Sequence, residues 1–201
     1  MQQLESALIP SVPPNMPKMG NRLTRGLGRS VMRLQGWRLT GEFPNEPKLM
    51  VALAPHTSNW DFVYAMPVIM ALGIKVSFLM KKEAFIWPLG NLFSWWGGIP
   101  INRTAAGDMV EQVADWYESH DQVWVAITPE GTRKKNDQWK SGFLRIAYRA
   151  QVPVFLMAWD YPSKRMHCDK LFMPTGDHAA DLEEIKQYFN GRYTGYNVEQ
   201  Q

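Results

Sequence analysis

The sequence predicts an α/β fold with a central, largely parallel sheet that is flanked by helices. Two observations support this class: short apolar runs of strand length alternate with longer segments of helical length, and polar clusters follow several of these runs. The 201 residues suffice for one substantial core, and no internal repeat divides them. We therefore expect an N-terminal tail and helix at residues 1–41, followed by one α/β domain at residues 42–201.

The composition indicates a globular protein, since 45% of the residues are hydrophobic and 20% are charged. Cys168 is the only cysteine, which excludes an internal disulfide and a cysteine-rich metal site and fits a reducing compartment. No stretch reaches the roughly 18 uninterrupted apolar residues of a membrane span. Residues 1–16 also lack the basic-then-apolar order of a signal peptide, so we expect neither feature.

The N-terminal region combines a proline-rich tail with a basic amphipathic helix. Four prolines within residues 1–19 favour an extended chain, whereas residues 20–36 have helical periodicity. Such a helix is typical of a membrane-surface anchor; alternatively, it packs on its own domain and leaves its arginines in solvent. One face carries Arg22, Arg25, Arg29 and Arg33, and the nearly opposite face carries Leu23, Leu27, Val31 and Leu34.

The strands are predicted from short apolar runs that are bounded by turn residues. Several of these runs are apolar throughout, which is typical of buried strands. In chain order, they are residues 37–41, 49–53, 76–80, 99–102, 123–127 and 154–159, with a short edge strand at 171–173.

The helices are predicted from longer segments whose apolar residues recur at helical spacing. Residues 84–96 form a mixed segment that we expect to be broken at Pro88 and Gly90. The helices that we expect to flank the sheet are residues 62–72, 108–118, 142–150 and 179–190.

The stretch from Pro55 to Asp61 joins the strand at 49–53 to the helix at 62–72. His56 and Asp61 would lie roughly 140° apart on one continuous helix, so they meet only if His56 is in the loop and Asp61 is in the first helical turn. A carboxylate there suits the helix dipole and can orient the imidazole of a histidine base. Ser58 and Asn59 are candidate N-cap residues for the helix.

Polar clusters follow the other predicted strands. Lys81 and Lys82 follow one strand, Arg103 follows the next, and residues 130–135 follow the strand at 123–127. Since the carboxyl ends of parallel strands meet at one edge, we expect these residues to converge there with His56. Each cluster alone also fits a solvated surface loop, but several cations beside a histidine favour an anionic substrate.

Four blocks resemble the glycerolipid and lysophosphatidic acid acyltransferases, in order and in spacing. Residues 55–61 (Pro-His-Thr-Ser-Asn-Trp-Asp) resemble the family's His-x-x-x-x-Asp block, and residues 82–103 resemble its second block. Residues 129–133 (Pro-Glu-Gly-Thr-Arg) match the Glu-Gly-Thr-Arg signature, and Val-Pro-Val at 152–154 resembles the fourth block. The resemblance covers residues 49 to 159 and implies the glycerolipid acyltransferase-like α/β fold.

The resemblance implies transfer of a fatty acyl chain from a thioester to the hydroxyl of a lipid acceptor, a step of phospholipid biosynthesis. It makes His56 the general base and Asp61 the residue that orients it. It implies no metal and no cofactor besides the donor, which is acyl-coenzyme A or acyl-acyl-carrier protein. The residues that it assigns to substrate binding are Lys81, Lys82, Arg103, Glu130, Gly131, Thr132 and Arg133.

Some positions depart from the family pattern and leave the acceptor open among glycerophosphates, lysophospholipids and related lipids. Thr128 stands where many members have Phe, Asn102 replaces an aspartate, and Lys134-Lys135 replaces a common serine. Six apolar residues of the second block fit an acyl groove, a membrane interface or ordinary core packing. They are Phe85, Ile86, Trp87, Phe93, Trp95 and Trp96.

Other functions are disfavoured by what the sequence lacks. A serine hydrolase would need a Gly-x-Ser-x-Gly elbow, and a thiol mechanism would need Cys168 and His167 to point the same way, which strand neighbours do not. His120 and His178 form no metal-ligand spacing, and no nucleic-acid motif accompanies the arginine helix. Two hypotheses remain: a peripheral acyltransferase on the cytoplasmic face of a membrane, or a non-catalytic module that binds lipid or acyl-carrier protein.

Overall fold

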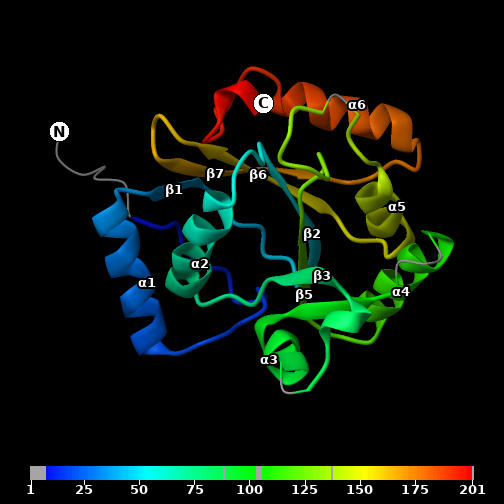
Figure 1. Ribbon diagram of the computed structural model, residues 1–201, viewed down its shortest axis with the longest axis horizontal. Helices are drawn as coiled ribbons and strands as arrows, with labels where there is room; N and C mark the ends of the chain where they lie inside the picture. The colour runs from blue at the N-terminus through cyan, green and yellow to red at the C-terminus, as the bar shows by residue number, and fades with distance from the viewer. Residues whose placement is uncertain (1–7, 88, 103–105, 137, 201) are drawn as a thin grey trace.

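The computed structural model describes residues 8–87, 89–102, 106–136 and 138–200 (Figure 1). Its centre is a seven-stranded sheet in the order β1-β7-β6-β2-β5-β3-β4. Neighbouring strands are parallel except β6 and β7, which confirms the predicted α/β class with a largely parallel sheet. The strands are β1 (Arg38–Gly41), β2 (Lys48–Ala54), β3 (Ser77–Lys81), β4 (Gly98–Ile101), β5 (Val123–Ile127), β6 (Val154–Asp160) and β7 (Arg165–Phe172).

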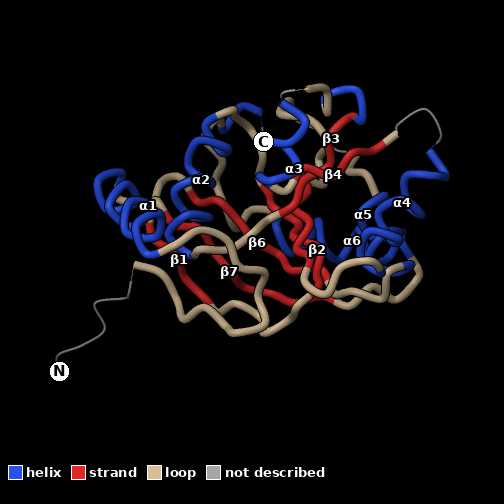
Figure 2. Tube along the Cα trace, turned by 90° about the horizontal axis from the view of Figure 1, so that it is seen from below, coloured by secondary structure: helices blue, strands red, loops and turns tan. Residues whose placement is uncertain are grey.

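Helices cover both faces of the sheet (Figures 1 and 2). The apolar side chains of the central strands alternate between two cores, because successive residues of a strand point to opposite faces. One core lies against α1 and α2, and the other lies against α4, α5 and α6. The helices are α1 (Arg22–Gln35), α2 (Trp60–Leu72), α3 (Leu89–Trp96), α4 (Ala106–Glu118), α5 (Gly142–Arg149) and α6 (His178–Phe189), with short 3-10 turns η1 (Lys82–Ala84) and η2 (Val198–Gln200).

The predicted edge strand at 171–173 is wrong in length and in position. β7 begins at Arg165 and lies between β1 and β6, antiparallel to β6, so the edge strand on this side is β1. Exposed or half-exposed polar residues alternate with buried ones along β7. This alternation interrupts the apolar run that would have marked a strand of eight residues.

Helix α1 packs closely on α2 through Gly28. A Cβ atom at Gly28 would come within 2.4 Å of the backbone nitrogen of Ala71 and 2.7 Å of the carbonyl oxygen of Pro67. Asn21 and Thr24 form a capping box at the start of α1, and Gly36 ends it in the left-handed conformation. The helix predicted at 20–36 is therefore confirmed and rests on the α/β domain; the domain boundary at residue 41 stays a prediction.

The segment between β3 and β4 contains a helix across a predicted break. α3 spans Leu89–Trp96 and includes Gly90, so Gly90 does not interrupt the helix as expected, while Pro88 lies outside the described residues. A Cβ atom at Gly90 would lie 2.7 Å from the carbonyl oxygen of Phe85, so a close backbone approach accounts for the glycine. No helix among the described residues has both the length and the apolar character needed to cross a membrane.

Candidate active site

The loop between β2 and α2 lies at the carboxyl edge of the sheet. β2 is central, with β5 on one side and β6 on the other, and both run parallel to it. The loop therefore emerges where the residues that follow β5 and β6 also emerge. Residues 55–59 form this loop, and Asp61 lies in the first turn of α2, as predicted.

His56 and Asp61 form a hydrogen-bonded pair, here called the dyad. The His56 Nδ1 and Asp61 Oδ2 atoms are 2.8 Å apart. The Asp61 side chain is only 3% exposed, whereas the His56 ring is 19% exposed. When Nδ1–H donates to the carboxylate, Nε2 is the acceptor nitrogen of the neutral ring. A partly exposed imidazole that a buried carboxylate orients can act as a general base.

The Asp61 carboxylate also organises the loop backbone. Its Oδ2 atom accepts hydrogen bonds from the N–H groups of Thr57 and Ser58, each at 3.1 Å. Asn59 occupies the N-cap position but makes no capping hydrogen bond, because its backbone is already helical. The Ser58 hydroxyl instead accepts from the Trp60 N–H at 3.1 Å. The cap expected from Asn59 is therefore wrong, and the one expected from Ser58 is present.

Glu130, directly after β5, holds the loop from the other side. Both of its carboxylate oxygens accept the His56 backbone N–H, at 3.0 and 2.9 Å. Burial raises the pKa of the Glu130 carboxyl from 4.5 to about 7, while the hydrogen bond from His56 opposes that rise. Glu130 therefore positions the histidine through its backbone.

The residues after Glu130 form a tight turn. Gly131 has a φ of 66°, a left-handed conformation that favours glycine. The Thr132 hydroxyl accepts the Lys134 N–H at 3.2 Å, and the Arg133 side chain is exposed. The turn thus presents Arg133 to solvent at the same edge as the dyad.

Two other predicted cations, Lys81 and Lys82, lie at the same edge of the sheet without contacting the dyad. Lys81 ends β3 and Lys82 begins η1, and both side chains are exposed. Among the described residues, no hydrogen bond or ion pair joins either lysine to the loop at 55–59. Arg103 follows β4 but lies outside the described residues, so its place in the site stays a prediction.

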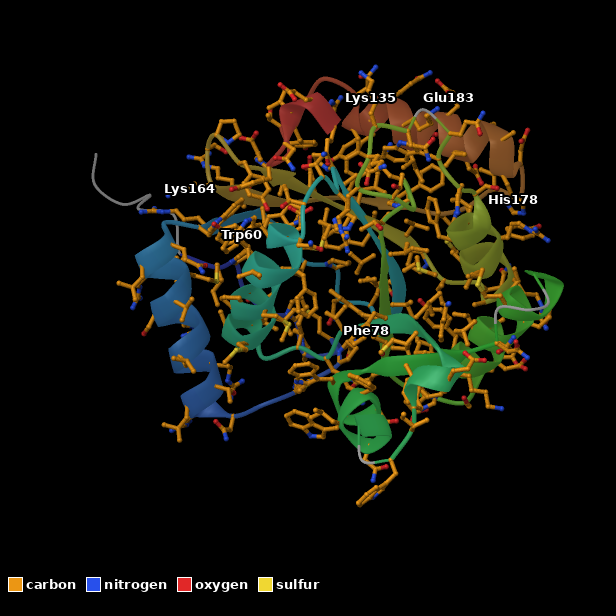
Figure 3. All side chains as sticks on the ribbon, viewed as in Figure 1. Trp60, Phe78, Lys135, Lys164, His178 and Glu183 are labelled. Carbon is orange, nitrogen blue, oxygen red and sulfur yellow. The ribbon has the colours of Figure 1, made fainter. Side chains whose placement is uncertain are left out.

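A hollow of about 390 Å³ lies between the turn after β5 and the end of α6. That volume is within the range of small-molecule sites. Of the predicted residues, His56, Glu130 and Thr132 line it. Lys134 and Lys135 of the predicted cluster at 130–135 also line the hollow, although neither was assigned to substrate binding, and Lys186 of α6 lines it without having been predicted. Lys135 and Glu183 border the hollow from the loop and from the helix (Figure 3).

Two residues from the last third of the chain contact Asp61 and the loop at 55–59. The Tyr161 hydroxyl donates to Asp61 Oδ1. Asn197 donates to Thr57 through its backbone N–H and through its side-chain amide, both at 3.1 Å. Neither residue belongs to a recognisable motif, and they lie 100 and 140 positions from their partners, so no local signal could have found them.

The remaining histidines and the cysteine lie elsewhere. Cys168 is fully buried, and burial raises the pKa of its thiol above the usual range; its neighbour His167 instead contacts Thr40. His120 stacks on Trp116, with ring centroids 4.4 Å apart. Within the described ranges, no three His, Cys, Asp or Glu side chains gather as ligands for a metal ion.

Comparisons with known proteins identify a family for this chain. The family described as Acyltransferase matches residues 38–159, which is more than half of the chain. A 1-acyl-sn-glycerol-3-phosphate acyltransferase of Streptococcus pneumoniae is 27% identical over 159 residues, which cover 71% of this chain and 56% of that protein. The human 1-acyl-sn-glycerol-3-phosphate acyltransferase beta is 27% identical over 145 residues, covering 69% and 51%. The chain thus spans about half the length of these curated relatives.

A solved structure has a similar fold. The crystal structure of the 1-acyl-sn-glycerophosphate acyltransferase PlsC of Thermotoga maritima matches with a TM-score of 0.58. The match covers 87% of this chain and 81% of that one, at 16% identity. Identity this low supports the likeness of the fold alone.

Proposed function

The chain belongs to the acyltransferase family, and on this premise we propose that it is an O-acyltransferase of the 1-acylglycerol-3-phosphate type. It moves a fatty acyl chain from an acyl thioester to the hydroxyl of a glycerophosphate, a lysophospholipid or a related lipid. The observation that carries the proposal is the dyad, in which the His56 ring is held by a buried carboxylate and the His56 backbone is held by Glu130.

The reaction needs a base and a carboxylate that orients this base. The Nε2 atom of His56 takes the proton of the acceptor hydroxyl while that oxygen attacks the thioester carbonyl. Asp61 stabilises the imidazolium that forms and keeps the ring in its orientation. The tetrahedral oxyanion, stabilised by nearby N–H groups or a cation, collapses. The new C–O bond stays, the C–S bond breaks, and the imidazolium returns the proton to the thiolate.

The cationic edge binds the anionic part of the acceptor. Lys81, Lys82, Arg103 and Arg133 are the residues that the family resemblance assigns to it, with Gly131 and Thr132 shaping the turn. Arg133→Ala should raise the acceptor KM about tenfold, since one charge-assisted hydrogen bond is worth about 1.5–3 kcal/mol, and should leave kcat nearly unchanged. Equal losses in kcat and in kcat/KM would contradict a role limited to binding.

The membrane surface is the proposed location, on its cytoplasmic face, and α1 supports it. Leu23, Leu27 and Leu34 are 83%, 57% and 88% exposed, so the leucine face of the helix is free to enter a lipid headgroup region. On another side of α1, a groove contains five cations and no carboxylate among its described lining residues. The five are Lys18, Arg22, Arg25, Arg29 and Arg33.

Sedimentation with vesicles tests the membrane proposal. The wild type should pellet with anionic vesicles at low salt, and a variant with Leu23, Leu27 and Leu34 changed to Ser should stay in the supernatant. Leu171, which is 43% exposed on β7, supplies the control variant Leu171→Ser, which should still pellet. Failure of the wild type to pellet would overturn the proposal.

Mass spectrometry tests the reaction itself. Wild type and His56→Ala are incubated with palmitoyl-acyl-carrier protein or palmitoyl-coenzyme A and a total polar lipid extract. His120→Ala removes a histidine outside the site and serves as the matched control. A new acylated lipid with wild type and with the control, but absent with His56→Ala, is the expected result and identifies both donor and acceptor. The same products from all three proteins, or no product from the folded wild type, would refute acyltransferase activity. Either result would favour a non-catalytic module that binds lipid or acyl-carrier protein.

A further inference from the structure

Each of the two strands beside β2 is followed by a residue whose side chain contacts the dyad. Glu130, after β5, binds the backbone of His56. Tyr161, after β6, donates its hydroxyl hydrogen to the side chain of Asp61. The dyad is therefore held from both flanks of the strand that carries it.

The hydrogen bond from Tyr161 satisfies the second oxygen of the Asp61 carboxylate. The Oδ2 atom of Asp61 already serves His56, Thr57 and Ser58. Its Oδ1 atom has Tyr161 as its donor, and no other described residue donates to it. An unsatisfied oxygen on a carboxylate that is 3% exposed would be costly, so the loss of this hydroxyl changes how the carboxylate is placed and how its charge is shared.

The tyrosine is itself fixed in position. Its ring lies edge-on to Trp37 and to Tyr196, with centroid distances of 5.0 and 5.4 Å. Its backbone N–H donates to the Thr194 carbonyl at 2.9 Å. Burial, followed by the hydrogen bond to Asp61, raises the pKa of the Tyr161 phenol well above its usual value, so the group remains a donor throughout the physiological range.

We propose that Tyr161 is a positioning residue for acyl transfer. Its hydroxyl fixes the rotation of the Asp61 carboxylate so that Oδ2 points at Nδ1 of His56, and it withdraws part of the negative charge onto Oδ1. This inference rests on the proposed function, in which His56 is the base. Without the phenol, the charge concentrates on Oδ2 and holds an imidazolium more strongly, so the free base forms only at higher pH.

Tyr161→Phe tests the proposal, because it removes the hydroxyl and keeps the ring. Tyr64→Phe is the matched control: Tyr64 packs on the same Trp37 and Tyr161 rings, and its hydroxyl makes no hydrogen bond within the described chain. We expect kcat to fall about tenfold in Tyr161→Phe, as for one hydrogen bond to a charged group, with both KM values within about twofold. The acid limb of the kcat profile should move up by about half a pH unit, and Tyr64→Phe should match wild type.

The titration of the His56 ring, followed by NMR, supplies a readout that needs no turnover. Glu130 faces the dyad, and Tyr64 and Tyr196 face Tyr161. The charged groups that line the same hollow as His56 are Lys134, Lys135, Glu183 and Lys186. All of these residues are kept in Tyr161→Phe. An upward shift of the His56 midpoint supports the positioning role even if no acceptor is acylated. A failure to acylate any acceptor would instead refute the proposed function. An unmoved midpoint and an unmoved pH profile would overturn the role, whatever the loss of thermal stability.

A second variant tests the proposal if Tyr161→Phe does not fold. Site-specific 3-fluorotyrosine at position 161 keeps the ring and the donor and makes the phenol more acidic. The stronger donor should shift the His56 midpoint downward, opposite to Tyr161→Phe. No shift, or an upward one, would overturn the proposal.

Discussion

The burial of Glu130 makes the stability of the folded protein depend on pH, and Glu130→Gln measures this dependence. Burial raises the pKa of the carboxyl from 4.5 to about 7. The folded state therefore binds this proton more tightly than the unfolded state does. The protonated Glu130 carboxyl contributes its full stabilisation below pH 4.5, and this contribution is lost as the pH rises to about 7 and beyond.

The size of the effect follows from the two pKa values. The interval from 4.5 to about 7, at about 1.4 kcal/mol per pH unit, gives an upper limit of about 3 kcal/mol. Water reaches part of the Glu130 side chain, so we expect about 1–2 kcal/mol. Glutamine cannot ionise, yet its amide oxygen can still accept the His56 N–H, which keeps the loop contact.

Urea unfolding at about pH 5 and about pH 8 is the assay. Between these two conditions, the free energy of unfolding of Glu130→Gln should rise by about 1–2 kcal/mol relative to wild type. Glu83→Gln, which neutralises an exposed carboxylate in η1, should show no such relative change. An equal difference between Glu130→Gln and wild type at both pH values would refute the reasoning.

Three further predictions follow from packing and contacts. Gly28→Ala should lower the free energy of unfolding by about 1–3 kcal/mol, because the new Cβ atom would clash with the backbone of α2. Gly26 has open space around it, so Gly26→Ala should raise the free energy of unfolding by up to about 1 kcal/mol. Equal effects of the two variants in thermal unfolding would contradict this packing. The buried Cys168 thiol should react with a thiol reagent only in denaturant, and fast labelling of the native protein would show that the residue is accessible. Asn197→Ala removes one hydrogen bond to Thr57 and should lower turnover about fivefold in the acyl-transfer assay; unchanged turnover would make the contact dispensable.

Local patterns predict much of the fold and the core of the site. The apolar runs at β2, β5 and β6 locate three strands within a residue or two, because strands buried on both faces need apolar residues throughout. The dyad is predicted because a loop and the first turn of a helix bring His56 and Asp61 together over five positions. Short-range geometry is visible in a sequence.

The supports of the dyad are not predicted in the same way. Tyr161 reaches Asp61 because β6 lies next to β2, and that neighbour relation depends on the topology of the whole sheet. Asn197 reaches Thr57 after the chain has passed through β7 and α6. The strand order that places these residues has no local signature, so their roles become visible only in three dimensions.

The contact between Asn197 and Thr57 spans 140 residues, and this bears on synthesis. The loop at residues 55–59 leaves the ribosome before Asn197 does, by about 7–30 s at about 5–20 residues per second. During the first part of that interval Asp61 lacks its contact from Tyr161, and throughout it Thr57 lacks its contacts from Asn197. A nascent chain therefore has its dyad residues but not their fixed geometry. Under the proposed function, full acyl-transfer activity would need these late contacts, so it would report that the residues after β6 have joined the folded sheet.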